Sequence, residues 1–469
     1  MSNLHESSQA KNSVVLLMFA LLVAIFAFQL NASMLSPALA TMAHELQVAD
    51  SEIGLTQTAF FAAAALFSLF LPRWADLIGR KKLLFGMLAV TGIGCVISAL
   101  APTVHILGLG RVIQGVAGPV VPMCLIMLHA EVKDPKRYAK LMAVLTSVNG
   151  GIAGVDALAG GFLAGNFGFR SVFWTMAIVC ALGALCILFF TKESRASEQV
   201  PMDWKGVVPL VIVLACLYFA FNEAGKLADA SWILIAVLVI IACISFVIFW
   251  KTEQKVKHPL VTTTYMKQRR TWGLLLTTLL TMTGVFAVMN GLVPNLAQDP
   301  SVGPGLSADV VSWFTLTPYA IAGLIMGPIS GQLAAKFGFK PVLQGGLVLS
   351  IIGLAILAFL APKISSMSLL GMSIFIGITY AGVCNIMLNG LGIVLSPADN
   401  QGYLPGMNAG AFNLGAGLSF AILFAVLSAV GASGNLSFAY QASIIAGAVL
   451  IALALVASFL IPKPEDLED

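Results

Sequence analysis

Long apolar runs alternate with short polar breaks along almost the whole chain. A helix of about 20 apolar residues crosses the roughly 30 Å hydrocarbon core of a bilayer. A membrane β-barrel would show short segments of alternating polarity, and no such series is found in the sequence. The pattern therefore predicts an all-α integral membrane protein. The fourteen expected spans are residues 14–42, 51–72, 83–101, 104–130, 138–166, 170–191, 204–222, 231–250, 271–296, 308–335, 340–361, 366–395, 401–430 and 437–461.

Composition strengthens this prediction. Only 10% of the 469 residues are charged, 59% are hydrophobic, and the mean hydropathy is +0.96. Because a soluble domain carries about 25% charged residues, no water-soluble domain is expected. The net charge of +4 is small and dispersed, so a nucleic-acid partner is not predicted. The seven cysteines lie singly in apolar runs without a CxxC pair, which argues against disulfides and against a metal site.

Lysine and arginine predict the orientation of the chain. If the N-terminus is cytoplasmic, 21 of the 25 Lys and Arg residues fall on the cytoplasmic side and three fall in outer loops. The remaining one, Arg111, lies within a span. Cytoplasmic loops of membrane proteins are enriched in Lys and Arg. We therefore expect a multi-pass protein of the cytoplasmic membrane with both termini cytoplasmic.

A faint internal repeat divides the chain. The segment 76–81 (DLIGRK) follows the second span, and the segment 335–340 (AKFGFK) follows the tenth. Two six-helix halves, separated by an inserted pair of helices, explain this spacing. The expected units are residues 1–200, residues 201–260 and residues 261–469. Repeated halves around a central site are a common transporter design.

Three motifs resemble the major facilitator superfamily over nearly the whole chain. Residues 72–82 (PRWADLIGRKK) resemble the family's loop between its second and third helices. Residues 111–118 (RVIQGVAG) resemble its fourth-helix motif. Gly160 and Gly161, followed by residues 168–174 (GFRSVFW), resemble the end of its antiporter motif. The resemblance implies a transporter rather than an enzyme, working by alternating access around a central cavity, with a small-molecule substrate and no cofactor.

The count of fourteen helices indicates one branch of this family. Residues 203–206 (DWKG) and 258–260 (HPL) are similar to the fourteen-helix drug:proton antiporter branch, which implies proton-coupled efflux of drugs or metabolites. Two positions depart from that branch. Asp156 and Ala157 stand where it has Gly-Pro, and Asn31 stands where many of its members have Asp. These departures leave open the alternative of a proton symporter that imports a polar nutrient such as a nucleoside or sugar.

Asp156 is the first candidate for the chemistry. An ionisable group deep in a span is costly and usually functional, so Asp156 is a candidate site for the coupling proton or the substrate. Arg111 lies at a similar expected depth, which allows either a structural ion pair with Asp156 or control of its proton. Arg111 could equally anchor its helix or attract an anionic substrate. Gln114 lies three residues after Arg111 and shares its helix face, and Asn31 is the fourth candidate.

Other polar residues of the spans are candidates for lining a cavity, because amides both donate and accept hydrogen bonds. Each could equally form interhelical hydrogen bonds. The cavity candidates are Gln57, Asn149, Asn290, Tyr380, Asn385, Asn389, Asn408 and Asn413, and Gln29 belongs to the same set of amides.

The polar loop after the second span has a different expected role. Asp76, Gly79 and Arg80 are expected to form a cytoplasmic gating loop, in which Asp76 pairs with an arginine at a neighbouring helix end. No phosphate-binding loop or catalytic constellation is present in the sequence, and we expect a monomer.

Overall fold

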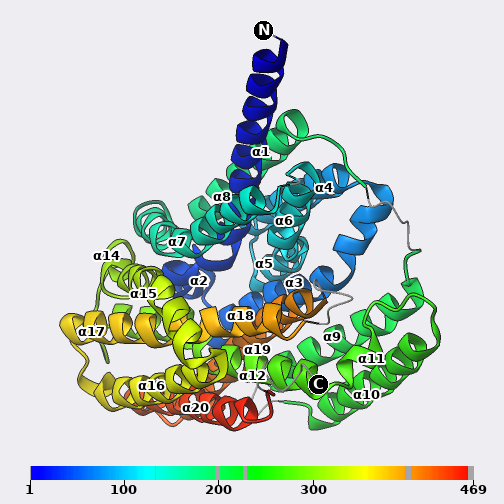
Figure 1. Ribbon diagram of the computed structural model, residues 1–469. Coiled ribbons are helices and arrows are strands. Elements are labelled where there is room, and N and C mark those ends of the chain that lie inside the picture. Colours follow the sequence, from blue (N-terminus) through cyan, green and yellow to red (C-terminus); the bar gives the residue numbers. More distant parts are fainter. Residues whose placement is uncertain (1, 133, 196–200, 225–229, 397–402, 463–469) are drawn as a thin grey trace.

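The computed structural model describes residues 2–132, 134–195, 201–224, 230–396 and 403–462 (Figure 1). Every regular element within these ranges is helical, which confirms the predicted all-α class. The first half contains α1 (Ser2–Ser33), η1 (Ser36–Ala38), α2 (Leu39–Leu46), α3 (Asp50–Ile78), α4 (Arg80–Ala99), α5 (Val104–Gln114), η2 (Gly115–Ala117), α6 (Val120–Glu131), α7 (Pro135–Phe167) and α8 (Phe169–Phe190).

The inserted pair and the second half follow in sequence. The inserted helices are α9 (Trp204–Ala224) and α10 (Trp232–Lys255). The second half contains α11 (Thr263–Met266), α12 (Arg269–Ala287), η4 (Val288–Leu292), α13 (Val293–Gln298), α14 (Ala308–Phe314), α15 (Leu316–Phe337), α16 (Phe339–Leu360), η5 (Ala361–Lys363), α17 (Ser366–Ile376), η6 (Gly377–Cys384), α18 (Asn385–Val394), α19 (Tyr403–Gly431) and α20 (Leu436–Ser458).

Thirteen helical stretches in the described residues are long and apolar enough to span a membrane. The remaining predicted span, residues 138–166, falls within the 33-residue α7. Several spans are broken helices. The first runs from Val14 to Leu46 and restarts at η1, where Pro37 occupies the start of the new turn. Proline has no backbone N–H and fits that position better than a helix interior.

The two halves lie against each other along two seams. In Figure 1 the blue and cyan helices of the first half occupy the upper part, and the yellow to red helices of the second half the lower part. Helix α3 packs on α19, and α7 packs on α14 and α15. The inserted helices α9 and α10 pack on each other, and α9 lies along α3 beside the first seam. Many large apolar side chains of α10 are exposed, as expected for a helix that faces lipid.

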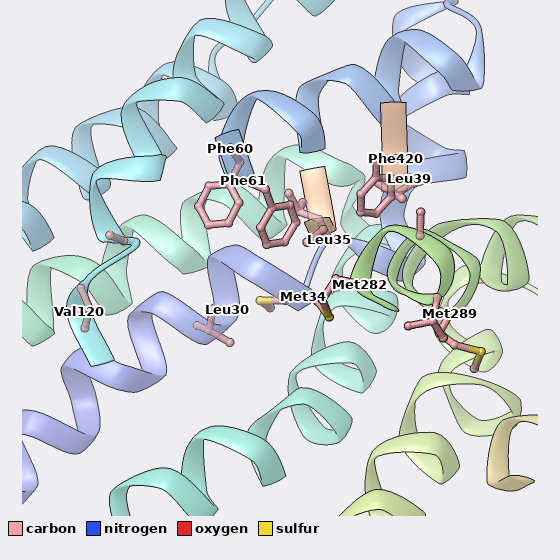
Figure 2. Close-up of a cluster of buried hydrophobic side chains, with 14 of the residues drawn as sticks. Leu30, Met34, Leu35, Leu39, Phe60, Phe61, Val120, Met282, Met289 and Phe420 are labelled. Atoms are coloured by element: carbon pink, nitrogen blue, oxygen red, sulfur yellow. The ribbon is translucent and has the colours of Figure 1, made fainter. Parts of the chain in front are cut away.

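Apolar side chains from both halves form one core across the first seam. Phe61 of α3 lies edge-on to Phe286 of α12, with ring centroids 5.1 Å apart, and stacks on Phe420 of α19 at 6.4 Å. Figure 2 shows Phe61 and Phe420 in the same buried cluster as Met282. Such offset aromatic pairs stabilise a contact beyond the area that they bury. The seam is therefore a packed interface.

The second seam depends on a close backbone approach at Gly161 in α7. A Cβ atom at this position would clash with the backbone oxygen of Ala308 in α14. No side chain fits there, so the glycine allows α7 and α14 to touch. Small residues have this role in membrane helix interfaces.

Candidate transport cavity

A cavity of about 530 Å³ lies between the two halves. Helices α1 and α3 form one wall, and elements of the second half from α12 to α19 form the rest. Its polar lining consists of Gln29, Ser33, Asn290, Tyr319, Tyr380, Asn385 and Asn413. Its aromatic rings, besides these tyrosines, are Phe28, Phe61, Phe286 and Phe412.

Two π-helical turns present polar side chains to the cavity. Asn290 belongs to the turn Val288–Leu292, and Tyr380 belongs to the turn Gly377–Cys384. A π-turn carries an extra residue, re-aims the side chains around it and is frequent at functional sites. The Nδ2 atom of Asn290 donates to the Phe286 oxygen at 3.0 Å, and the Tyr380 hydroxyl donates to the Met282 sulfur at 2.6 Å.

Several polar groups of the lining have unused hydrogen-bonding capacity. Within the described residues, the Asn413 amide and the Tyr319 hydroxyl have no hydrogen-bond partner. Asn385 accepts from Asn389 Nδ2 at 3.0 Å through its Oδ1 atom, which leaves its Nδ2 donor free. All three residues belong to the second half. The cavity can therefore offer donors and acceptors to a polar molecule that also contacts aromatic rings.

Asp156 lies directly behind this lining. Its side chain is 2% exposed, and its Oδ2 atom accepts a hydrogen bond of 2.5 Å from the Ser33 hydroxyl. Its Oδ1 atom is buried and has no hydrogen-bond partner among the described residues. No ion pair joins Asp156 to Arg111 in the described structure, so the structural pair that the sequence allowed is not formed. Asp156 is instead a buried carboxyl with no cation, one hydroxyl away from the cavity.

The backbone on either side of Asp156 holds the second seam together. The Thr317 hydroxyl of α15 donates to the Gly154 oxygen at 2.7 Å, and the Ser312 hydroxyl of α14 donates to the Ala157 oxygen at 2.9 Å. Asp156 therefore lies on the segment of α7 that accepts hydrogen bonds from the second half.

Arg111 is held inside the first half. It is fully buried, and both terminal nitrogens donate to the Asn31 backbone oxygen at 3.1 Å. One of them also donates to Gln114 Oε1 at 2.6 Å and the other to Gln57 Oε1 at 2.9 Å. The guanidinium lies 4.2 Å from the centre of the Phe60 ring. Arg111 thus joins α1, α3 and α5, and it does not line the cavity.

The remaining predicted residues divide into two groups. Asn290, Tyr380, Asn385 and Asn413 line the cavity. Gln57 lies against Arg111, Asn389 contacts Asn385, and the side chain of Asn149 lies outside the described residues. Asn408 is buried between helices, where it accepts from Thr278 at 2.6 Å and donates to the Leu388 oxygen at 3.2 Å.

Asn31 also differs from the prediction, because its side chain faces the core of the first half. Its Nδ2 atom donates to the Ala27 oxygen at 2.8 Å, and its Oδ1 atom accepts from the Cys95 thiol at 3.2 Å. The side-chain and backbone groups of Asn31 are both used within this half.

The predicted gating loop lies at the junction of α3 and α4. Gly79 has φ +117°, a conformation that favours glycine, and the turn places Arg80 2.9 Å from Asp76. The Glu193 carboxylate accepts from the backbone nitrogens of Lys81 and Lys82 at 3.0 and 3.2 Å. Asp76 therefore pairs with Arg80 at the start of the next helix, within the first half and not across the two halves.

Sequence reasoning missed Ser33 and Tyr319. Ser33 follows Gln29 by four positions, which places both on one helix face. This spacing could have indicated that Ser33 lines the cavity beside Gln29. Nothing in the sequence indicates that Tyr319 lines the cavity, because a single tyrosine in an apolar run usually packs against neighbouring helices.

A polytopic helical protein with two halves around a polar and aromatic cavity has the architecture of a secondary transporter. The chain matches the Major Facilitator Superfamily over residues 21–420 and belongs to that family. The predicted fold and family resemblance are therefore confirmed.

Individual relatives and structures add detail. The chain is 60% identical over 468 residues to a uridine/deoxyuridine transporter of Lactococcus lactis subsp. cremoris. The aligned region covers 98% of this chain and 97% of that transporter. It is 24% identical to multidrug resistance protein 3 of Bacillus subtilis, over 76% of this chain and 68% of that one. Among solved structures, the nucleoside transporter NupG aligns with a TM-score of 0.65 at 14% identity, covering 95% of this chain and 100% of that one. At that identity the likeness concerns the fold alone.

Proposed function

We propose that this protein imports uridine and related nucleosides across the cell membrane together with protons. The observation that carries the proposal is the cavity, in which free amide and hydroxyl groups stand among aromatic rings with a buried carboxyl behind them. The 60% identity to a uridine/deoxyuridine transporter supports the same substrate class. We place both termini on the cytoplasmic side and treat residues 1–200, 201–260 and 261–469 as the working units of a monomer.

The chemistry of the lining suits a nucleoside. A volume of about 530 Å³ falls within the ~300–1,000 Å³ typical of small-molecule sites. The carbonyl and N–H groups of a uracil ring complement the free groups of Asn385 and Asn413, since an amide both donates and accepts. Base–aromatic stacking contributes about 1–3 kcal/mol per base in single-strand binding proteins. The rings of Phe286 and Phe412, which line the cavity and are partly exposed, are available for such contacts.

Drug efflux is the weaker candidate. The multidrug relative named above is 24% identical to this chain, far less than the 60% of the uridine/deoxyuridine transporter. The described cavity lining contains no carboxylate that would attract a cationic drug. The replacement of Gly-Pro by Asp156 and Ala157 in α7 also removes part of the antiporter signature. Import therefore agrees better with both the sequence and the cavity.

Hydrogen bonds between the two halves suggest how the cavity opens to one side at a time. Gln298 Nε2 donates to the Pro37 oxygen at 3.2 Å, and the Ser312 and Thr317 hydroxyls bond to α7. In the proposed orientation these contacts lie toward the outer side of the cavity. We infer that they form the outer gate and must break when the cavity opens to the outside.

We expect Gly161→Leu to prevent the outer gate from closing. The leucine would clash with the Ala308 backbone, and overpacking costs about 1–3 kcal/mol. Since ~1.4 kcal/mol corresponds to a factor of ten, this cost should lower uptake by roughly 5- to 150-fold. Spin labels at the outer ends of α7 and α14 should move apart. The control is Gly331→Leu in α15, where a Cβ atom meets nothing within 4 Å. Wild-type uptake by Gly161→Leu would show that this contact is not part of the cycle.

The proposal is tested by uptake of labelled uridine into proteoliposomes with an imposed proton gradient. Uridine should accumulate when the gradient is directed inward, deoxyuridine should compete, and glucose and cationic dyes should not. Asn413→Leu should raise KM by roughly tenfold, the loss of about one hydrogen bond to a polar ligand. Asn166→Leu, at the exposed end of α7, is the matched control. Extrusion of dyes without uridine uptake would overturn the proposal.

A further inference from the structure

The Ser33 hydroxyl connects the cavity to Asp156. Ser33 and Gln29 both line the cavity. Gln29 Nε2 donates to Ser33 Oγ at 3.0 Å, and Ser33 Oγ lies 2.5 Å from Asp156 Oδ2. A continuous line of hydrogen bonds therefore runs from an amide in the cavity wall to the buried carboxyl.

Ser33 has two acceptors for its single proton. Besides Asp156 Oδ2, the Gln29 backbone oxygen lies 3.0 Å from Ser33 Oγ. When Asp156 is ionised, the hydroxyl must point at the carboxylate, which can only accept. When a proton binds to Oδ2, the new O–H can donate to Ser33 Oγ, and the serine proton can turn to the Gln29 oxygen. The hydroxyl thus has a distinct orientation for each state of Asp156.

The Gln29 amide favours one of these orientations. Its donation to Ser33 polarises the hydroxyl and strengthens the bond to an ionised Asp156, because hydrogen bonds in a chain reinforce each other. A nucleoside that takes the Gln29 amide for its own hydroxyl or carbonyl groups removes this donation. Without this donation the Ser33 hydroxyl is a weaker donor to an ionised Asp156, while its oxygen can still accept from a protonated Asp156. Substrate binding at Gln29 would therefore favour proton binding at Asp156.

We propose that Ser33 is the positioning residue that links nucleoside binding to the proton on Asp156, an inference that rests on the proposed proton-coupled import. Linkage is reciprocal, so a proton on Asp156 tightens nucleoside binding as much as the nucleoside tightens proton binding. This is the relation that a symporter requires, since both ligands must be bound before the loaded halves move.

Few other charged or titratable groups lie on the elements packed against this part of α7. Tyr319 of α15 faces the cavity, and Asp309 of α14 lies against Gly165, nine residues beyond Asp156. Arg170 of α8 pairs with Glu45 at 3.3 Å. Among the described groups, none of these charges contacts Asp156. The Ser33 hydroxyl is the described side-chain group that is hydrogen-bonded to the Asp156 carboxyl.

The test measures the uridine Kd of purified protein as a function of pH, together with proton uptake on uridine addition in weakly buffered solution. In the wild type, uridine binding should weaken as pH rises through the titration of Asp156. The total change should lie in the range of about 5- to 150-fold that is typical of coupled sites. Ser33→Ala should bind uridine at low pH but vary less than about twofold over the same range, with no proton uptake.

Three further variants keep the test decisive. Ser33→Thr retains the hydroxyl and should restore the pH dependence, whereas Gln29→Met should lose it even if Ser33→Ala fails to fold. Ser68→Ala, in which the hydroxyl that donates to the Ala64 oxygen of its own helix α3 is lost, should behave as the wild type. A full pH dependence in both Ser33→Ala and Gln29→Met would overturn the linkage and leave proton symport intact. A wild type that binds no uridine, or binds it independently of pH, would overturn the proposed function itself.

Discussion

Asp156→Asn should abolish concentrative uridine uptake while leaving exchange intact. A gradient of one pH unit stores about 1.4 kcal/mol per proton, which supports about tenfold accumulation for one proton per nucleoside. The asparagine cannot carry the coupling proton, so the accumulation ratio should fall to about one. It can still accept from Ser33 and keep α7 in place, so counterflow of labelled against unlabelled uridine should continue.

The comparison needs a carboxyl that is not part of the proposed coupling. Asp299 accepts from the Ser301 nitrogen at 2.8 Å and from its hydroxyl at 2.6 Å, through a single oxygen that asparagine also has. Asp299→Asn should therefore accumulate uridine normally. If Asp156→Asn also accumulates uridine about tenfold under a gradient of one pH unit, the carboxyl is structural and coupling takes place elsewhere. If neither accumulation nor counterflow survives, Asp156 is required for the fold or for binding.

Arg111→Met should destabilise the protein more than any substitution in the cavity. The change leaves the Asn31 oxygen, Gln57 Oε1 and Gln114 Oε1 buried without the donor that now satisfies them. Each buried group left unsatisfied costs about 1–3 kcal/mol, partly offset because a buried charge is removed. We expect the melting temperature in detergent to fall by roughly 5–10 °C. Fluorescence-detected melting of the purified variants measures this.

Lysine separates the two interpretations of Arg111 that the sequence left open. Arg111→Lys keeps the charge, but one ammonium cannot reproduce the planar fork or its stacking on Phe60. An anchoring role predicts an intermediate loss of stability and an unchanged KM in the protein that folds. A role in attracting the substrate predicts the opposite, with normal melting and a raised KM. The control is Arg269→Lys, because Arg269 is exposed and donates to the Leu460 oxygen at 2.8 Å.

The arrangement of Arg111 and Asp156 shows where sequence reasoning ended. Their similar depth in neighbouring spans allowed an ion pair. In the structure Arg111 turns toward Asn31 inside the first half, whereas Asp156 meets Ser33 at the cavity. Depth follows from position along a helix, because each residue rises about 1.5 Å. The direction in which a side chain points around the bundle depends on helix rotation and packing, which the sequence pattern does not specify.

The same distinction applies to the amides. Asn413 and Asn408 lie five residues apart on α19, yet Asn413 lines the cavity and Asn408 bonds between helices. Both looked alike in the sequence, because any amide in a span needs a partner and either environment can supply one. The π-turns that bring Asn290 and Tyr380 to the cavity depend on local packing and were not foreseen.

The sequence by itself determined that the chain is helical, that it crosses the membrane many times and that it is a major facilitator transporter. Helix length, apolar runs and short backbone motifs are local properties, and they can be read without knowing how the helices pack. The cavity, the partner of Asp156 and the separation of Arg111 from it were decided only by the tertiary structure. Each depends on which faces of α1, α7 and the second half meet, and that is settled by close packing between residues far apart in the chain.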